Sequence, residues 1–187
     1  MKRYLLVITL VSISTMAHAQ QRHADGIDNY LEYSPYAAML VLKACGVKSQ
    51  DDWTPMTLSM AATWVVTAGT ATALKRIVNE RRPDNSNHRS FPSAHTAITV
   101  AGATLLHKEF GKVSPWISVA GYGVATCVGI DRVLKDRHYW HDVAAGATLG
   151  FVMTEVTWWL SRKVLKSSKG QVMIGFGDNT LDLTVRF

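Results

Sequence analysis

Apolar residues recur along the chain in long stretches separated by short polar segments, and prolines stand at the ends of these stretches. Pro35, Pro55 and Pro115 each follow a Ser or Thr, a pair typical of the first turn of a helix. Pro83 should end the helix that precedes it. The pattern predicts five helices, over about residues 34–45, 55–81, 93–108, 115–131 and 140–166. Helices joined by short loops indicate an all-α fold, a helical bundle of about five to six helices.

The last residues follow a different period. From Thr180 to Phe187, polar and apolar residues alternate strictly, which is the period of a strand. Residues 171–177 precede this segment, and Asp178-Asn179 can form the turn between two strands. We therefore expect a small C-terminal β-hairpin over residues 171–187, marginal in stability by itself, attached to a helical domain over residues 20–170.

Residues 1–19 have the features of an export signal peptide. Lys2 and Arg3 form a positive start, the segment from Tyr4 to Met16 carries no charge, and Ala17-His18-Ala19 fits a cleavage site. The apolar run is shorter than the ~20 residues needed to span a membrane, which favours cleavage over an N-terminal anchor. We expect an exported protein, periplasmic or membrane-associated.

The composition excludes some classes of protein. Hydrophobic residues make up 48% of the chain and charged residues 18%, which fits a large core or partial membrane contact and argues against disorder. The net charge is +6, but the basic residues form no stripe interleaved with aromatic residues. Nucleic acid is therefore not an expected partner. The oligomeric state stays open.

Several features bear on membrane contact. The uncharged runs Trp53 to Leu74 and Val113 to Ile130 are long enough to cross a membrane. Gly146 and Gly150 have the spacing that lets two helices approach closely, and Trp158–Lys166 resembles an interfacial belt. A soluble bundle is the alternative, because the mean hydropathy of +0.05 is low for a chain with several spans. We expect attachment to a membrane or embedding in it.

The chain contains two cysteines, Cys45 and Cys127. In an oxidising compartment they can pair, and two separate buried thiols are the alternative.

Three polar segments are not explained by the apolar helices around them. In the first, Lys75 and Arg82 are seven residues apart, so that one helix face would carry two cations that repel each other unless an anion joins them. In the second, Ser93, Ala94 and His95 lie at the start of a helix, where free amides and the helix dipole attract phosphate. A solvated basic helix end and an ordinary capping serine are the respective alternatives.

The third polar segment contains His138 and Asp142, four residues apart, and Arg132. A helical turn would stack the carboxylate on the imidazole, where it can accept the Nδ1 proton and leave Nε2 as a nucleophile. Arg132 supplies a third cation. The alternative is a carboxylate at a helix start beside a surface histidine.

Together the segments read Lys-x6-Arg-Pro, Pro-Ser-x-His and Arg-x5-His-x3-Asp. Over about residues 55–160 this order resembles the type 2 phosphatidic acid phosphatase family, within the acid phosphatase and vanadium haloperoxidase superfamily. The resemblance implies that His138 attacks phosphorus and becomes phosphohistidine, that Asp142 orients it, and that His95 protonates the leaving alcohol and then activates water. It further implies a set of ligands for the phosphoryl oxygens: Lys75, Arg82, Arg132, Ser93 and the backbone N–H of Ala94.

Two positions depart from the family pattern. Ala94 stands where the family usually has Gly, and an alanine there can tilt the amide that binds phosphate. Asp131 stands where Ser is common, and its carboxylate can pair with Arg132 and compete with phosphate. Both departures bear on rate and substrate preference more than on the class of reaction.

The resemblance implies a metal-independent phosphatase without a cofactor, with vanadate as an expected inhibitor. Its substrates would be lipid phosphates or isoprenoid pyrophosphates, among them phosphatidic acid, phosphatidylglycerophosphate and phosphorylated lipid A, or in soluble relatives small phosphomonoesters. Trp158–Lys166 favours a membrane lipid. Three alternatives remain: a vanadium haloperoxidase, a metal hydrolase with ligands among His138, His141 and Asp142, and a non-catalytic phospholipid-binding protein.

Overall fold

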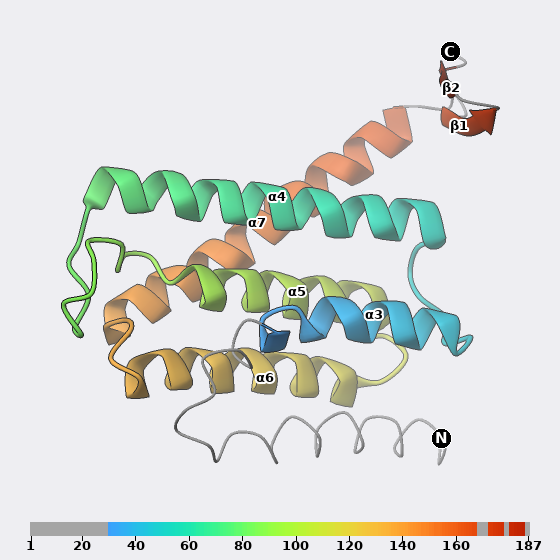
Figure 1. The fold of residues 1–187 in the computed structure, drawn as a ribbon. Helices are drawn as coiled ribbons and strands as arrows, with labels where there is room; N and C mark the ends of the chain where they lie inside the picture. Colours follow the sequence, from blue (N-terminus) through green and yellow to red (C-terminus); the bar gives the residue numbers. More distant parts are fainter. Residues whose placement is uncertain (1–29, 168–171, 178–179, 186–187) are drawn as a thin grey trace.

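The fold of the chain was analysed in a computed structural model, which describes residues 30–167, 172–177 and 180–185, with side chains as far as Lys163. Its five helices are α3 (Ser34–Ala44), α4 (Trp53–Val78), α5 (Ala94–Phe110), α6 (Pro115–Leu134) and α7 (Trp140–Ser167) (Figure 1). The predicted all-α bundle is confirmed, and the helix ends differ from the sequence-based boundaries by three residues at most.

The chain ends in the expected hairpin. Strand β1 (Val172–Gly177) pairs with β2 (Thr180–Val185) in antiparallel fashion, with Val172 opposite Val185. The turn predicted at Asp178-Asn179 and the expected export signal lie outside the described residues.

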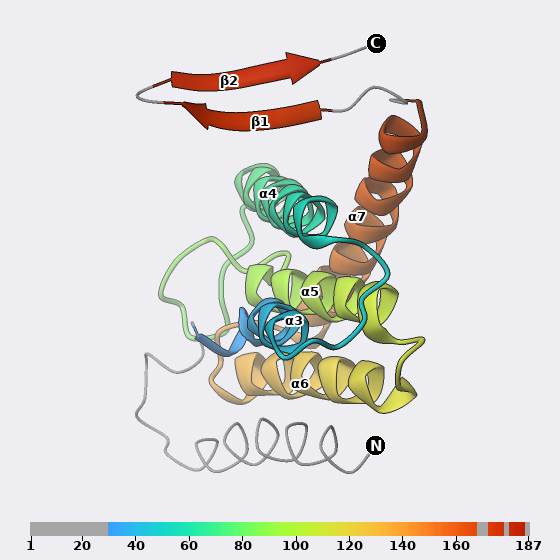
Figure 2. The same ribbon diagram turned by 90° about the vertical axis from the view of Figure 1, so that its right-hand side faces the viewer.

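Helix α5 lies at the centre of the bundle and contacts α3, α4, α6 and α7 (Figure 2). Almost all its residues are buried, and many of them are Ala, Gly or Thr. A helix with such small side chains lets its neighbours approach closely on all sides. Gly102 illustrates this, because a Cβ atom at this position would lie 2.6 Å from the ring of Tyr36 in α3.

Two glycines bring α7 against the backbone of α5. A Cβ atom at Gly146 would overlap the carbonyl oxygen of Ser93, and one at Gly150 would overlap that of Ala97. The close helix approach predicted from the spacing of Gly146 and Gly150 is therefore confirmed. A hydrogen bond of 3.3 Å from Oγ1 of Thr154 to the carbonyl oxygen of Ala101 adds to the same contact.

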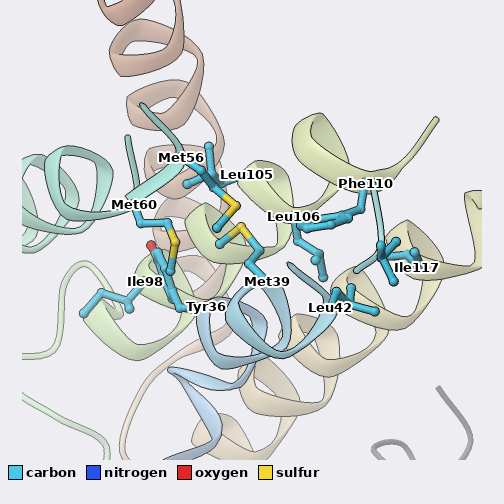
Figure 3. Close-up of a cluster of buried hydrophobic side chains, with 11 residues drawn as sticks. Tyr36, Met39, Leu42, Met56, Met60, Ile98, Leu105, Leu106, Phe110 and Ile117 are labelled. Carbon is cyan, nitrogen blue, oxygen red and sulfur yellow. The ribbon is translucent and has the colours of Figure 1, made fainter. Parts of the chain in front are cut away.

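A cluster of large apolar side chains fills the space between α3, α4, α5 and α6 away from this contact (Figure 3). Its fully buried members include Met39, Met56, Leu105 and Phe110. Met39 and Met56 face each other between α3 and α4 in Figure 3, where unbranched side chains adapt to an irregular gap. The cluster fixes α3 and α4 on the central helix.

Helix α4 ends earlier than predicted. Asn79 adopts the left-handed conformation, with φ 51° and ψ 40°, and its amide donates to the carbonyl oxygen of Lys75. Asparagine tolerates this conformation and so ends the helix four residues before Pro83. The prediction that Lys75 and Arg82 share a helix face is therefore wrong, because Arg82 lies in the following loop.

The outer surface of the bundle is apolar over large areas. By length and composition, α6 over Pro115–Leu134 and α7 over Trp140–Lys163 could each cross a membrane. Many large apolar side chains on the outside are exposed: Trp116, Val119, Leu134, Trp140, Phe151, Val156, Trp159 and Leu160.

Both cysteines are unpaired, and both are exposed. The alternative of two buried thiols is wrong as well, because Cys45 follows the end of α3 and Cys127 lies on the outward side of α6 beside the exposed Thr126.

Gly150→Ala should destabilise the protein by about 1–3 kcal/mol, because the new methyl group would push α7 away from the backbone of α5. Gly123→Ala in α6 is the matched control, since no atom lies within 4 Å of its added Cβ and alanine favours the helix. Denaturant unfolding in detergent should show a lower free energy of unfolding for Gly150→Ala and no decrease for Gly123→Ala. Equal stability of the two variants would contradict this packing.

Candidate active site

The three polar segments meet at one end of the bundle, where the loops before α5 and α7 lie (Figure 1). The amide of Ser93 donates to the carbonyl oxygen of Asp142 over 3.0 Å and joins the start of α5 to the first turn of α7. The amide of Asp84 donates to the carbonyl oxygen of Asp136 over 3.0 Å and joins the loop after α4 to the loop after α6. Segments far apart in the sequence thus form one site.

His138 lies just before α7 and is 2% exposed. Its Nδ1 atom is 3.5 Å from Oδ2 of Asp142, a distance at the limit of a hydrogen bond, and such contacts are often long before substrate binds. The amide of His138 donates to the carbonyl oxygen of Arg132 over 3.2 Å. With Nδ1 toward the carboxylate, Nε2 is the ring nitrogen that can attack an electrophile.

The Asp142 carboxylate is fully buried and is fixed from several sides. Its Oδ2 atom accepts hydrogen bonds from the hydroxyl of Ser90 and, over 2.9 Å, from the amide of Tyr139, as the third residue of a helix commonly does. Its Oδ1 atom lies 3.2 Å from Nε2 of His141, which is also 2.9 Å from Oε1 of Glu80. Asp142 can therefore hold the ring of His138 in one orientation.

The surroundings of His138 keep its ring neutral. Burial lowers the pKa of His138 to about 3. Three neighbouring cations act in the same direction: Lys75, Arg132 and Arg82. The charge of Asp142 opposes them without overcoming them. At neutral pH the imidazole therefore retains the lone pair that a nucleophile needs.

Lys75 is anchored on the loop that precedes α5. Its Nζ atom donates to three backbone carbonyl oxygens: Arg89 at 2.8 Å, Ser90 at 3.2 Å and Pro92 at 2.6 Å. Burial, together with the nearby arginines, lowers the pKa of Lys75 to about 8. The ammonium group is thus fixed in position while it remains largely charged at neutral pH.

Arg82 and Arg132 reach the site from different elements. Arg132 is buried in the last turn of α6, and Arg82 is held in the loop after α4, where its amide donates to the carbonyl oxygen of Asn87 over 3.0 Å. Burial lowers the pKa of Arg82, and its Nε atom is buried without a hydrogen-bond partner among the described residues. An anion bound in the site would supply that partner.

The helix start expected at Ser93 is present. Ser93 is the N-cap of α5, and its Oγ atom lies 2.9 Å from Oγ1 of Thr96. Ala94 is the first helical residue and does not require a positive φ, so the alanine at this position is accommodated without backbone strain. The other departure from the family pattern, Asp131, forms an ion pair of 3.1 Å with Lys135.

His95 lies in the first turn of α5 and faces a residue that the sequence analysis did not single out. Its Nε2 atom is 3.7 Å from Oε2 of Glu32, which is buried ahead of α3. Burial raises the pKa of Glu32. A single glutamate between Leu31 and Tyr33 forms no motif with its neighbours, so only the fold could reveal it.

Glu80, His141 and Asp142 place three potential metal-ligand atoms within 4.8 Å of one another. The same carboxylate of Asp142 faces His138, whose surroundings are strongly positive. Nearby cations disfavour a divalent ion, and the short contact between Glu80 and His141 is satisfied as a hydrogen bond. These residues therefore fit a chain of carboxylates and imidazoles better than a metal centre.

Comparison with known proteins identifies the family of this chain. A model of the PAP2 superfamily matches residues 52–166, which include the three polar segments. The chain belongs to the PAP2 superfamily. The resemblance to type 2 phosphatidic acid phosphatases noted from the motifs is thereby confirmed.

Individual relatives of this PAP2 protein include two curated phosphatases. The lipid A 1-phosphatase of Porphyromonas gingivalis is 38% identical over 145 residues, 77% of this chain and 33% of the relative. The decaprenylphosphoryl-5-phosphoribose phosphatase of Mycobacterium tuberculosis is 34% identical over 89 residues, 43% of this chain and 47% of the relative. The chain therefore spans about a third to a half of the length of these relatives.

The crystal structure of Aquifex aeolicus LpxE has the same fold. It superposes on this PAP2 chain with a TM-score of 0.56 at 20% sequence identity, over 83% of this chain and 94% of the crystallised one.

The stability of the protein should depend on pH through His138. The folded protein lowers the pKa of this residue from 6.5 to about 3, so acid protonates the unfolded chain first and favours unfolding. The stabilisation present above pH 6.5 is lost as the pH falls toward about 3. Denaturant unfolding at about pH 7 and about pH 4.5 should therefore show a smaller loss of stability in His138→Gln than in the wild type. Equal losses in the two proteins would contradict a buried neutral imidazole.

Proposed function

We propose that this PAP2 protein is a metal-independent phosphatase that removes phosphate from membrane lipids through a phosphohistidine on His138. One observation carries the proposal: the imidazole of His138 is buried with its Nδ1 atom 3.5 Å from Oδ2 of Asp142, and Lys75, Arg82 and Arg132 lie near enough to lower its pKa. Arg132 is buried and Lys75 and Arg82 are half-buried, and a partly desolvated cluster of positive charge is unfavourable unless an anion neutralises it. A phosphoryl group supplies that charge and the electrophile for the imidazole.

In the proposed reaction each residue of the site has a separate role. Nε2 of His138 forms a bond to phosphorus as the ester P–O bond breaks, and His95 gives a proton to the departing alkoxide. Water then attacks the phosphohistidine, the P–N bond breaks, and His95 takes up the proton that the water loses. Phosphoryl transfer depends mainly on positioning and on neutralising the equatorial oxygens. In this site those oxygens are held by a fixed set of groups: Lys75, Arg82, Arg132, Ser93 and the amide of Ala94.

No metal ion is needed in this scheme. Lys75, Arg82 and Arg132 supply the positive charge that a divalent ion provides in other phosphatases, and they would repel such an ion. The role of Asp142 is to hold and polarise the imidazole.

Two observations support a lipid as the substrate. The two curated relatives described above are named for phosphorylated lipids, lipid A and decaprenylphosphoryl-phosphoribose. The helices that flank His138, α6 and α7, are also those that by length and composition could cross a membrane. Membrane association would place the phosphorylated headgroup at the end of the bundle where the site lies. The expected export signal over residues 1–19 favours a site that faces the periplasm.

Purified protein should release inorganic phosphate from a lipid panel in EDTA. The panel consists of phosphatidic acid, phosphatidylglycerophosphate, an isoprenoid pyrophosphate and phosphorylated lipid A in mixed micelles, with p-nitrophenyl phosphate as the soluble ester. We expect faster release from at least one lipid than from the soluble ester, and a loss of at least about 10³-fold in His138→Ala.

His107→Ala is the matched control, because His107 lies exposed at the far end of α5, where it contacts Ser118. It should retain wild-type activity. Absence of phosphate release from every substrate, or full activity of His138→Ala, would contradict the proposed function. If the protein hydrolyses p-nitrophenyl phosphate faster than every lipid, the proposed reaction stands but the protein is a non-specific phosphatase.

Vanadate should inhibit the phosphatase in competition with substrate, because its five-coordinate form imitates phosphorus during transfer. Arg82→Met should weaken this inhibition, whereas Arg76→Met, an exposed position on α4, should not. Inhibition constants measured with the preferred substrate test this expectation. Vanadate that leaves the hydrolysis unaffected would contradict a site shaped for the transferred group, and bromide oxidation by the vanadate-loaded protein with peroxide would identify a haloperoxidase.

A further inference from the structure

Glu32 is a buried carboxylate beside the active site that none of the three polar segments contains. It is 6% exposed, lies in the turn just before helix α3, and precedes the region matched by the family model. Its Oε2 atom is 3.7 Å from Nε2 of His95. A carboxylate is rarely buried to this extent unless a partner compensates for the lost hydration.

The groups around Glu32 come from three elements. His95 faces it from α5, and the positive charge of Arg132 on α6 lowers its pKa. Tyr33 is its neighbour in the sequence, and Tyr36 lies on α3. Burial raises the pKa of Glu32, while the side chain of Tyr33 and the charge of Arg132 oppose that rise. The glutamate thus faces an imidazole that can gain a proton and lies near enough to a permanent cation to feel its charge.

We propose that Glu32 is a positioning residue that stabilises the protonated ring of His95 for transfer of a proton to the leaving alcohol. This inference rests on the proposed function, in which His95 acts as the general acid. It gives the site a carboxylate–imidazole pair in addition to Asp142–His138. The two pairs have opposite roles, because Asp142 orients a nucleophile whereas Glu32 supports an acid.

The electrostatics of the site explain why such a pair is needed. Lys75, Arg82 and Arg132 favour a phosphate anion, but the same charges disfavour an imidazolium ion nearby. A carboxylate next to His95 offsets this effect at the one position where a protonated ring is required. The charge of Asp142 does not serve this purpose, because its carboxylate faces His138 and His141.

The geometry also indicates the path of the proton. Since Nε2 of His95 lies toward Glu32, the proton that moves to the ester oxygen would be carried on Nδ1. As the P–O bond breaks, Nδ1 gives up this proton, and the neutral ring then accepts a proton from the water that attacks phosphohistidine. Glu32 keeps its contact with Nε2–H through both steps.

The leaving group of the substrate provides a direct test. An alkyl phosphate needs protonation of its leaving oxygen, whereas p-nitrophenyl phosphate releases a stable anion and needs little. Glu32→Gln keeps the size of the side chain but removes its charge. We expect kcat/KM to fall about tenfold or more for the alkyl ester and less than about threefold for the aryl ester, since a general acid contributes roughly 10²- to 10⁴-fold.

The pH profile gives a second measurement. Without the carboxylate, the protonated form of His95 should persist only to a lower pH. The alkaline limb of kcat/KM for the alkyl ester should therefore shift to lower pH in Glu32→Gln. The double variant with His95→Ala should be no slower than His95→Ala alone, because Glu32 acts only through that ring.

Glu109→Gln is the matched control. Glu109 is also a buried glutamate of the bundle, 2% exposed, and burial raises its pKa to about 7. It lies at the opposite end of α5, fourteen residues from His95 and so about 21 Å away along the helix, and accepts a hydrogen bond from the amide of Asp51. Its substitution should leave the ratio of alkyl to aryl rates and the pH profile unchanged.

The outcomes separate this inference from the proposed function. Suppose that the wild type releases phosphate and His138→Ala does not. If Glu32→Gln then lowers kcat/KM equally for the alkyl and the aryl ester, or changes neither kcat/KM nor the pH profile, the proposed role of Glu32 is overturned. The proposed phosphatase function is unaffected by that result. If the wild type releases no phosphate from any substrate, the proposed function itself fails.

Discussion

The close contact between α7 and α5 is the constraint on which the site depends. Gly146 lies against the carbonyl oxygen of Ser93, and one turn earlier the carbonyl oxygen of Asp142 accepts the amide of the same serine. A side chain at Gly146 would separate these backbones. It would also move the start of α5 away from the carboxylate of Asp142, which lies 3.5 Å from the ring of His138. Because α5 also contacts the other three helices, packing on this one helix sets the positions of α4 and α6, which carry Lys75 and Arg132. The spacing of two glycines thus matters as much to the chemistry as the charged residues do.

This packing brings together charges that repel one another. Lys75, Arg82 and Arg132 all lower the pKa of His138, and the arginines also lower that of Lys75. The ammonium group of Lys75 is held by backbone carbonyl oxygens, which compensate for lost hydration without neutralising its charge. The fold therefore gives up part of its stability for a site that attracts an anion. The neutral imidazole and the fixed cations are two consequences of the same arrangement, since the charges that would bind phosphate also keep the nucleophile unprotonated.

The sequence predicted the helices because their apolar runs and prolines are local signals. It indicated a candidate site because three motifs occur in a characteristic order. It failed where one residue or the tertiary structure decides. Asn79 ends α4 by adopting a left-handed conformation that its neighbours in the sequence do not indicate, so Arg82 enters from a loop instead of a helix face. Cys127 lies in an apolar run but faces outward. Glu32 was not predicted because a single glutamate is usually exposed, and only the tertiary structure buries it and brings it near His95 of α5.

The position of His138, the proposed nucleophile, connects the proposed chemistry to the apolar exterior. His138 lies between the end of α6 and the start of α7, and exposed apolar side chains, Leu134 and Trp140, stand on either side of it. A soluble phosphate ester would gain nothing from such neighbours. A lipid, in contrast, could keep its chains along α6 and α7 while its phosphate reaches the cations, so that binding energy from the apolar part positions the reacting group. In this arrangement the charged site needs only to recognise the phosphate, and discrimination among lipids would come from the surfaces of the two helices that flank it.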